Sequence, residues 1–428
     1  MFSIRRLSIV AAAATLALLG AACGNGGSGE AGGGGEDGST AAKLIGDGSL
    51  KVGYVLPETG QLAFLGPPQI QGTKMAVAQI NAAGGVLGKQ IPAPVASDEA
   101  GDQAVAQQSA DRLLASDVQA VVGAAASGMT LAIIDKITGA KVVQCSASNT
   151  APTFTNYQDN GYYFRTAPSD ALQGPVLADT IVGDGHSKVA IVARADDYGK
   201  GLASATAQSV REAGATVALN NSYDPGATNF DAVVQRVVNA RPDAVAVIAF
   251  EEGTQILKGL IEAGYGPGDV GVYGADGLRS EELPGLVDPK DTSVLAGMKG
   301  TAPASAENAR FTAALQAFAP DLKELQYAPQ AFDCMTIIGL AAQQAGSNNP
   351  EIFKSDMISV TKDGTKCTAF ADCKRLINNG TNIDYEGVSG PVNLIPAGEP
   401  GEATIEVYSY DQSGKLQTEK TVQSTPVS

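Results

Sequence analysis

The chain has 428 residues, a formal net charge of −16 and a single histidine. This carboxylate excess argues against a nucleic-acid partner, because binding to phosphates needs clustered Lys and Arg. The histidine, His186, lies in a polar loop, and no acidic cluster with ligand spacing accompanies it, so neither a metal nor another cofactor is expected.

Residues 1–22 are typical of an export signal. Arg5 and Arg6 precede an apolar run over residues 7–19, and three small residues then lead to Cys23. The run is shorter than the about 20 apolar residues of a membrane-spanning helix, which favours a cleaved signal. The small residues before Cys23 resemble a bacterial lipobox, in which the cysteine is acylated, although Gly20 stands where the usual pattern has leucine.

A flexible linker is expected to follow, so that the lipidated cysteine and its tether cover residues 23–47. Residues 24–40 consist almost entirely of Gly, Ser, Ala, Glu and Asp, which cannot bury enough apolar surface to fold. Ordinary globular sequence begins near residue 48. The roughly 380 residues that remain are more than one hydrophobic core usually supports, so two domains are expected.

Short apolar runs alternate with longer amphipathic ones from residue 51 onward, an order typical of parallel sheets with crossover helices. In the first half we expect strands at residues 51–56, 120–123 and 141–145, and helices at 69–82 and 130–138. The same order returns in the second half, with strands at 188–193, 243–250 and 270–274 and helices at 201–213, 230–239 and 253–263. The repetition predicts two similar α/β lobes with a cleft between them.

Ligands of such sheets bind beyond the carboxyl ends of the strands, where the loops converge. In one of these loops Ser127 begins a helix whose free N–H groups favour an anion such as a carboxylate, unless the serine is an ordinary helix cap. In another, Asp276 would complement an ammonium group, unless it is a turn aspartate bonded to its own backbone.

Catalytic functions are poorly supported. Nucleophilic hydrolysis would need a base beside the nucleophile, but His186 is the only histidine and no Gly-x-Ser-x-Gly elbow follows a strand. The first strand leads into Leu-Pro-Glu-Thr-Gly-Gln at residues 56–61 rather than into a Gly-x-Gly-x-x-Gly turn. We therefore do not expect an enzyme.

Four cysteines remain if Cys23 carries lipid, an even number for an oxidising compartment. Cys367 and Cys373 are close in sequence and have polar neighbours, so a disulfide between them is predicted. Cys145 and Cys334 lie in apolar segments and form either a second disulfide or two buried free thiols.

Residues 50–410 resemble the leucine/isoleucine/valine-binding family of ABC-transporter solute-binding proteins, which has the type I periplasmic-binding fold. The resemblance rests on the order of several short pieces, among them Lys-Val-Gly-Tyr-Val-Leu-Pro at residues 51–57, Ile-Asn-Ala-Ala-Gly-Gly at 80–85, Phe-Arg-Thr at 164–166 and Asp-Tyr-Gly at 197–199. It implies two parallel-sheet α/β sandwich lobes joined by a three-segment hinge, with crossings near residues 164–168, 299–302 and 398–404. Lobe 1 would comprise residues 48–165 plus 302–400, and lobe 2 residues 166–301 plus 401–428.

The same resemblance implies the residues of an amino-acid site. Ser127 matches the serine that binds the ligand carboxylate, and Ser148, through its carbonyl, and Thr150 match the loop that holds both ends of the amino-acid group. Tyr198 matches a tyrosine of the second lobe, and Asp276 stands where the family often has a glutamate for the ammonium.

Two departures leave the pocket apolar: Phe250 replaces a tyrosine, and Leu65 replaces an aromatic residue that covers the ligand side chain. The export signal and the lipobox-like Cys23 predict an exported lipoprotein on the outer face of the cytoplasmic membrane, in the periplasm or at the cell surface. The resemblance adds what this lipoprotein would do. Such a protein would capture a branched-chain or other uncharged amino acid and deliver it to the permease of an ABC importer. The alternative is a ligand-sensing domain for an amide or a small organic acid.

Overall fold

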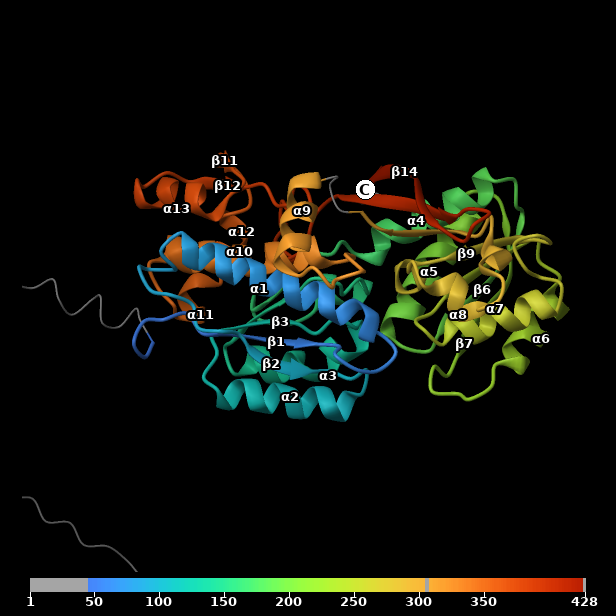
Figure 1. Ribbon diagram of the computed structural model, residues 1–428, viewed down its shortest axis with the longest axis horizontal. Helices are drawn as coiled ribbons and strands as arrows, with labels where there is room; N and C mark the ends of the chain where they lie inside the picture. The colour runs from blue at the N-terminus through green and yellow to red at the C-terminus, as the bar shows by residue number, and fades with distance from the viewer. Residues whose placement is uncertain (1–44, 305–307, 426–428) are drawn as a thin grey trace, which may run out of the picture. The chain divides into compact units, whose positions relative to one another are not determined.

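The computed structural model describes residues 45–304 and 308–425. The predicted export signal, Cys23 and residues 24–44 of the predicted linker lie outside the described residues. The described chain forms two large sheets, each with helices on both faces (Figure 1). We call the five-stranded sheet with its helices the first lobe and the seven-stranded sheet with its helices the second lobe.

All strands of the first lobe are parallel and follow the order β2-β1-β3-β4-β5. They are β1 (Val52–Leu56), β2 (Val95–Asp98), β3 (Ala120–Gly123), β4 (Val143–Ser146) and β5 (Tyr163–Arg165). Every residue of β1 and β3 is buried, because helices cover both faces of the sheet. Alternate residues serve different cores: Tyr54 and Leu56 belong to one cluster and Val55 to another.

The helices of the first lobe come from two distant parts of the chain. One face carries α1 (Gly66–Ala82), α9 (Ala309–Phe318), α10 (Ala328–Ala345) and α13 (Phe370–Asn378), and the other carries α2 (Gln103–Ala115) and α3 (Ser127–Gly139) (Figure 1). Helices α1 and α10 approach closely at Gly72, where a Cβ atom would lie 2.3 Å from the carbonyl oxygen of Ala328. Only glycine fits at this position.

The second lobe has a mixed sheet, in the order β14-β13-β10-β9-β8-β6-β7. Its strands are β6 (Lys188–Arg194), β7 (Thr216–Tyr223), β8 (Ala244–Ile248), β9 (Gly271–Gly274), β10 (Lys299–Pro303), β13 (Ala403–Tyr410) and β14 (Leu416–Ser424). Five are parallel, as expected, but β13 and β14 are antiparallel to their neighbours. A short turn joins these two strands, and a tight turn permits only antiparallel pairing.

Helices α4 (Asp170–Gly183) and α5 (Asp197–Glu212) pack together on the second sheet, away from α6 (Asp231–Ala240), α7 (Gly253–Glu262) and α8 (Leu283–Val287). Strand β6 contributes to both cores, with Val189 and Ile191 in one and Ala190 and Val192 in the other. Such alternation is the period of two that a strand imposes.

Shorter elements complete the chain: the 3₁₀ helices η2 (Ala63–Leu65), η3 (Pro152–Asn156), η4 (Asp276–Leu278) and η5 (Thr292–Leu295), helices α11 (Pro350–Phe353) and α12 (Asp356–Ser359), and strands β11 (Thr365–Cys367) and β12 (Ile383–Tyr385). The structure contains the predicted Cys367–Cys373 disulfide. Cys145 of β4 and Cys334 of α10 are also bonded, with their Cα atoms 5.8 Å apart, so they are not free thiols.

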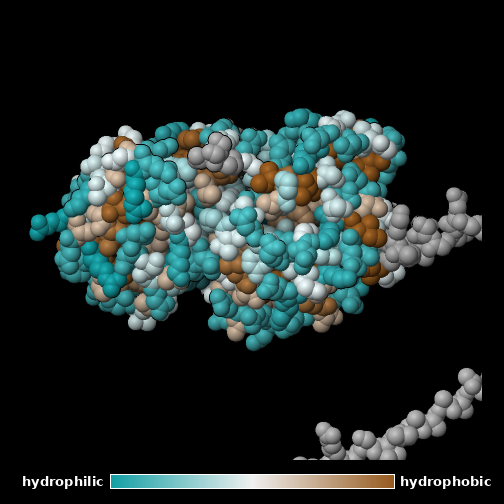
Figure 2. All heavy atoms as spheres, turned by 180° about the vertical axis from the view of Figure 1, so that it is seen from behind, coloured by the Kyte–Doolittle hydropathy of each residue, from teal (hydrophilic) through white to brown (hydrophobic). Residues whose placement is uncertain are grey.

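The chain passes between the lobes three times, as the resemblance implies: after β5, after β10 and before β13. Strand β10 stays in the second sheet as far as Pro303, so this crossing follows Pro303 rather than lying at 299–302. The face seen in Figure 2 is mostly hydrophilic, with small separate apolar patches. Within the described ranges, no helix has both the length and the apolar character to cross a membrane.

Candidate functional site

Loops at the carboxyl ends of strands from both lobes enclose a small cavity. It contains about 280 Å³ of atom-free space, part of it open to solvent. Its lining residues are Leu62, Leu65, Ala125, Ala126, Ser127, Ser148, Tyr198, Phe250, Asp276, Gly277 and Tyr327. Six of the seven predicted ligand-binding residues are therefore brought together, and the seventh, Thr150, is buried but is not among the lining residues. Leu62 and Tyr327 were not predicted.

Ser127 is the first residue of α3, so it is not the residue that caps this helix. The capping position is occupied by Ala126, which makes no side-chain cap. The hydroxyl of Ser127 instead accepts a hydrogen bond of 3.3 Å from the backbone N–H of Ala151. The N–H groups in the first turn of a helix have no intrahelical acceptor. Together with the helix dipole, they make this wall of the cavity suitable for an anion.

A fully buried carboxylate, Glu99, holds the loop before α3 in place. It accepts hydrogen bonds from the backbone N–H groups of Ala125 (2.6 Å) and Ala126 (3.1 Å). Burial raises the pKa of Glu99 to about 8, and the two N–H donors only partly oppose this rise. Glu99 follows β2, a strand that was not predicted, so its role was not foreseen.

The loop after β4 supplies Ser148 and Thr150. The hydroxyl of Ser148 lies 3.1 Å from both Gln69 Oε1 and the carbonyl oxygen of Ala125, so it is used within the first lobe. Thr150 is buried but does not line the cavity, and its backbone carbonyl accepts a hydrogen bond from the N–H of Asp170 at the start of α4 (2.7 Å).

Asp276 begins η4 in the second lobe and, among the described residues, is the only charged one that lines the cavity. Its Oδ1 accepts hydrogen bonds from the Tyr198 hydroxyl (2.8 Å) and Gln173 Nε2 (3.0 Å), and its Oδ2 accepts one from the Tyr327 hydroxyl (2.8 Å). Burial raises the pKa of Asp276, and these three donors oppose the rise. Three side chains therefore hold this carboxylate at the cavity wall.

Tyr327 reaches Asp276 from the other lobe. It precedes α10 and has a left-handed backbone with φ of 63°, which is uncommon for a residue other than glycine. The side chain of its neighbour Gln326 donates to the backbone carbonyl of Asp276 (3.1 Å). The segment before α10 thus links the two lobes directly at the site.

Apolar side chains form the remaining walls. Leu62 and Leu65 come from the first lobe, and the Phe250 ring stacks on Tyr198 with centroids 5.2 Å apart. The guanidinium of Arg194 lies 3.5 Å from the Phe250 centroid and bonds Glu252 (2.9 Å), which fixes the ring. The cavity thus combines an anion-binding end, a carboxylate end and apolar sides.

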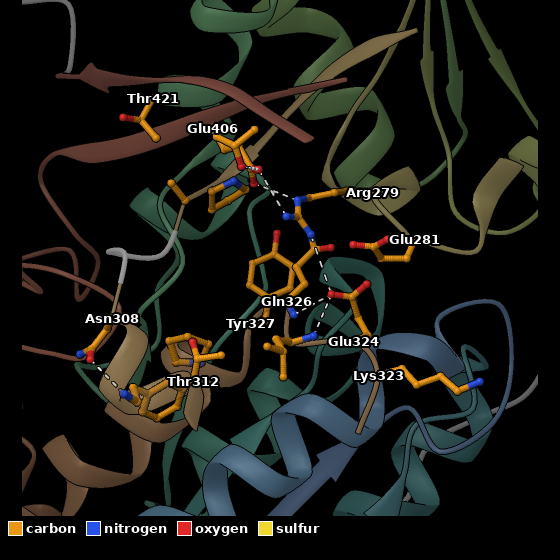
Figure 3. Close-up of a pocket in the computed structure, with 16 residues that line it drawn as sticks. Arg279, Glu281, Asn308, Thr312, Lys323, Glu324, Gln326, Tyr327, Glu406 and Thr421 are labelled. Carbon is orange, nitrogen blue, oxygen red and sulfur yellow. Dashed lines mark hydrogen bonds and ion pairs between the residues drawn. The ribbon is translucent and has the colours of Figure 1, made fainter. Parts of the chain in front are cut away.

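A larger cavity lies next to this one and shares Tyr327 with it (Figure 3). Its central cation, Arg279, is already paired with Glu406 (2.8 Å) and Glu324 (3.8 Å), as the dashed lines in Figure 3 show. Because two carboxylates already hold Arg279, this cation is not free to bind an anion, and the cavity is a weaker candidate for a charged ligand. In the part of the chain that the structure describes, no three His, Cys, Asp or Glu residues gather as a metal site would require.

Comparison with known sequences identifies a family that spans most of the chain. Residues 49–415 match a family model described as periplasmic binding protein. The leucine-, isoleucine-, valine-, threonine-, and alanine-binding protein of Pseudomonas aeruginosa is 28% identical over 307 residues, which cover 71% of this chain and 80% of that protein.

Solved structures show the same fold. The branched-chain amino acid transporter substrate binding protein LivJ from Streptococcus pneumoniae, in complex with isoleucine, superposes with a TM-score of 0.71 at 24% identity, covering 88% of this chain and 100% of that one. A solute binding protein of an ABC transporter from R. palustris, in complex with 4-hydroxybenzoate, gives a TM-score of 0.72 at 20% identity, covering 88% and 98%. Two chemically different ligands thus occur on this fold.

Proposed function

We propose that this chain, which belongs to the periplasmic binding protein family, captures a small uncharged amino acid between its lobes and delivers it to the permease of an ABC importer. Membership makes the chain a solute-binding protein rather than an enzyme. The observation that carries the proposal is the pairing of opposite ends in one cavity: the first turn of α3 in one lobe and the carboxylate of Asp276 in the other.

The two ends complement the two charges of an amino acid. A ligand carboxylate would accept hydrogen bonds from the Ser127 hydroxyl and the first-turn N–H groups of α3. A ligand ammonium would pair with Asp276. Because these groups belong to different lobes, a ligand that touches both stabilises the closed state by its differential contacts.

The apolar walls limit the ligand's side chain. Leu65 and Phe250 offer no charged or hydrogen-bonding side-chain group, so an aliphatic or other uncharged side chain fits there best. A branched-chain amino acid is one member of this class. The leucine-, isoleucine-, valine-, threonine-, and alanine-binding protein of P. aeruginosa, by its name, binds ligands of this class.

A small organic acid is the second candidate, because the R. palustris structure holds 4-hydroxybenzoate. Such a ligand could use the same end of α3. It would leave Asp276 without a cationic partner inside a buried site, which is costly for a charged carboxylate. The amino acid is therefore preferred.

The proposal is tested by thermal-shift screening against amino acids, amides and aromatic acids, followed by calorimetry with the best ligand. Asp276→Asn should weaken binding by a factor of about 150 to 4,000, since removing one partner of a buried ion pair costs about 3–5 kcal/mol. Ser127→Ala should cost less, about 1.5–3 kcal/mol, because helix N–H groups still hold the carboxylate. The control is Asp179→Asn, an exposed carboxylate on α4. Unchanged affinity in Asp276→Asn would favour the organic acid.

We further propose that the chain is exported and held at the membrane by lipid on Cys23. The order of charged, apolar and small residues before this cysteine supports the proposal. Cys23→Ala should release the protein from the membrane fraction of expressing cells. Retention equal to that of the parent would refute the anchor without affecting the ligand assignment.

A further inference from the structure

Both polar atoms of the Gln61 side chain, which belongs to the first lobe, are bonded to the second lobe. Its Nε2 donates to the backbone carbonyl of Pro225 (2.9 Å), in the loop after β7. Its Oε1 accepts a hydrogen bond from Nη1 of Arg194 (3.4 Å), at the end of β6. Gln61 lies between β1 and η2, is half-buried and is not among the residues that line the ligand cavity. The contact therefore joins the lobes beside the cavity without being part of it.

The strand orders place this contact at the edge of the lobe interface opposite the hinge. In the first sheet, β5 leads into the hinge and forms one edge, whereas β1 lies next to the other edge. In the second sheet, the hinge strands β10 and β13 lie toward one edge, and β6 and β7 are the last two strands at the other. When two lobes rotate about a hinge, the points farthest from it separate most. The bonds of Gln61 therefore break at the start of opening.

The turn that carries Gln61 is held firmly by the first lobe. Gly60 has a φ of 86°, and a Cβ atom there would lie 2.2 Å from the carbonyl oxygen of Ala100, so this turn requires glycine. The carboxylate of Asp98 accepts hydrogen bonds from the N–H of Glu58 (2.9 Å) and the hydroxyl of Thr59 (2.6 Å). Gln61 is thus presented to the second lobe from a fixed position.

Its partner Arg194 is held equally well. Asp196 and Glu252 both pair with the guanidinium, which also lies 3.5 Å from the ring centroid of Phe250. Phe250 lines the ligand cavity. One aromatic ring therefore separates the contact at Gln61 from the space that a bound solute occupies.

We propose that Gln61 is a latch, a positioning residue that keeps the lobes closed over a bound solute and sets the rate at which the solute is released. This inference goes beyond the proposed function. It requires a solute-binding protein whose lobes close, whichever solute the cavity holds.

An ordinary surface glutamine would bond water or its own lobe. Both partners of Gln61 instead come from the second lobe, and they follow two different strands. Because the side chain is half-buried, water replaces both partners when the lobes separate, so neither lobe needs these bonds in order to fold. The bonds therefore favour closure rather than folding.

The expected effect concerns the release of the solute. Gln61→Ala removes both bonds from the closed state, and each bond corresponds to a factor of about 2 to 13 in an equilibrium constant. Release should therefore be about 5- to 150-fold faster. The association rate should stay the same, since the solute enters the open protein, in which the latch is not formed. Because Gln61 does not line the cavity, the same factor should apply to different solutes.

Surface plasmon resonance on the immobilised protein measures both rates. The probes are L-leucine and L-alanine, whose uncharged side chains differ in size. If neither binds, the two compounds of the thermal-shift panel that raise the melting temperature of the parent most replace them. A second variant, Gln61→Asn, keeps the amide but is one methylene shorter, so it does not reach both partners. The control is Gln108→Ala, at an exposed glutamine of α2.

We expect both Gln61 variants to release the two probes faster by one common factor, and the control to keep the parent rates. Parent release rates in Gln61→Ala would refute the latch. Unequal factors for the two probes would refute it as well, because they would mean that the neighbouring cavity wall at Leu62 has moved. If Gln61→Ala does not fold, Gln61→Asn decides by the same criteria. Failure of every amino acid to bind would refute the proposed function, whereas the latch is then tested with the other compounds.

Discussion

The hydrogen bond between Tyr327 and Asp276 joins the two lobes, and Tyr327→Phe removes it without changing the ring. The bond is 2.8 Å long, and Tyr327 is buried, so water does not replace the lost donor. A hydrogen bond to a charged group contributes about 1.5–3 kcal/mol. Since the donor and the acceptor belong to different lobes, the bond forms only when the lobes are closed. Removing it therefore destabilises the closed state relative to the open state.

The expected result is an affinity about 10- to 150-fold lower, because the ligand must supply the free energy that the bond no longer contributes. Tyr198→Phe is the matched control. It removes a hydrogen bond of the same length to the same carboxylate, but from within the second lobe. Both variants weaken the support of Asp276, whereas only Tyr327→Phe weakens closure.

Calorimetry measures the affinity, and small-angle X-ray scattering of the ligand-free protein measures how far the lobes separate. The radius of gyration should increase in Tyr327→Phe and stay at the parent value in Tyr198→Phe. If both variants show the same affinity and the same scattering, the bond from Tyr327 has no role in closure, and the reasoning is refuted.

The remaining predictions concern stability. Loss of the Cys145–Cys334 disulfide, which spans 189 residues, should lower the free energy of unfolding by about 5 kcal/mol through loop entropy. Loss of Cys367–Cys373, which spans 6 residues, should lower it by about 2 kcal/mol. Chemical denaturation of the cysteine-to-serine variants should therefore show the larger loss for the first disulfide. A reversed order would contradict the entropic argument. The pKa of Glu99 is raised from 4.5 to about 8, so its protonation stabilises the fold fully below pH 4.5 and this contribution is lost as the pH rises through 8. Glu99→Gln should remove this decline of several kcal/mol in the free energy of unfolding, and an unchanged pH slope would show that Glu99 is ionised throughout.

The sequence predicted the elements whose patterns are strong. Strands β3 and β9 are short and mostly buried, and their predicted ranges agree with the structure to within one residue. Strand β7 escaped detection because it is a half-exposed edge strand without a continuous apolar run. Helix α4 was missed because Pro175 lies in its interior, where proline normally ends a helix.

The candidate site was predictable as far as local sequence governs it. Loops that follow buried strands carry Ser127, Tyr198 and Asp276, and the fold places all three at one cavity. Tyr327 enters from a segment with no such signal. Its position depends on how the segment before α10 packs against the second lobe, which is a tertiary property that periodicity does not report.

The threefold passage of the chain between the lobes affects how the protein is made. The first lobe is incomplete without α10, which packs on α1 and bonds Cys145 through Cys334. The second lobe lacks β13 until nearly the whole chain has been synthesised. The first core therefore cannot close before α10 has been synthesised, and the second sheet cannot be completed before β13 has. Until then the growing chain exposes apolar surface of both lobes to water.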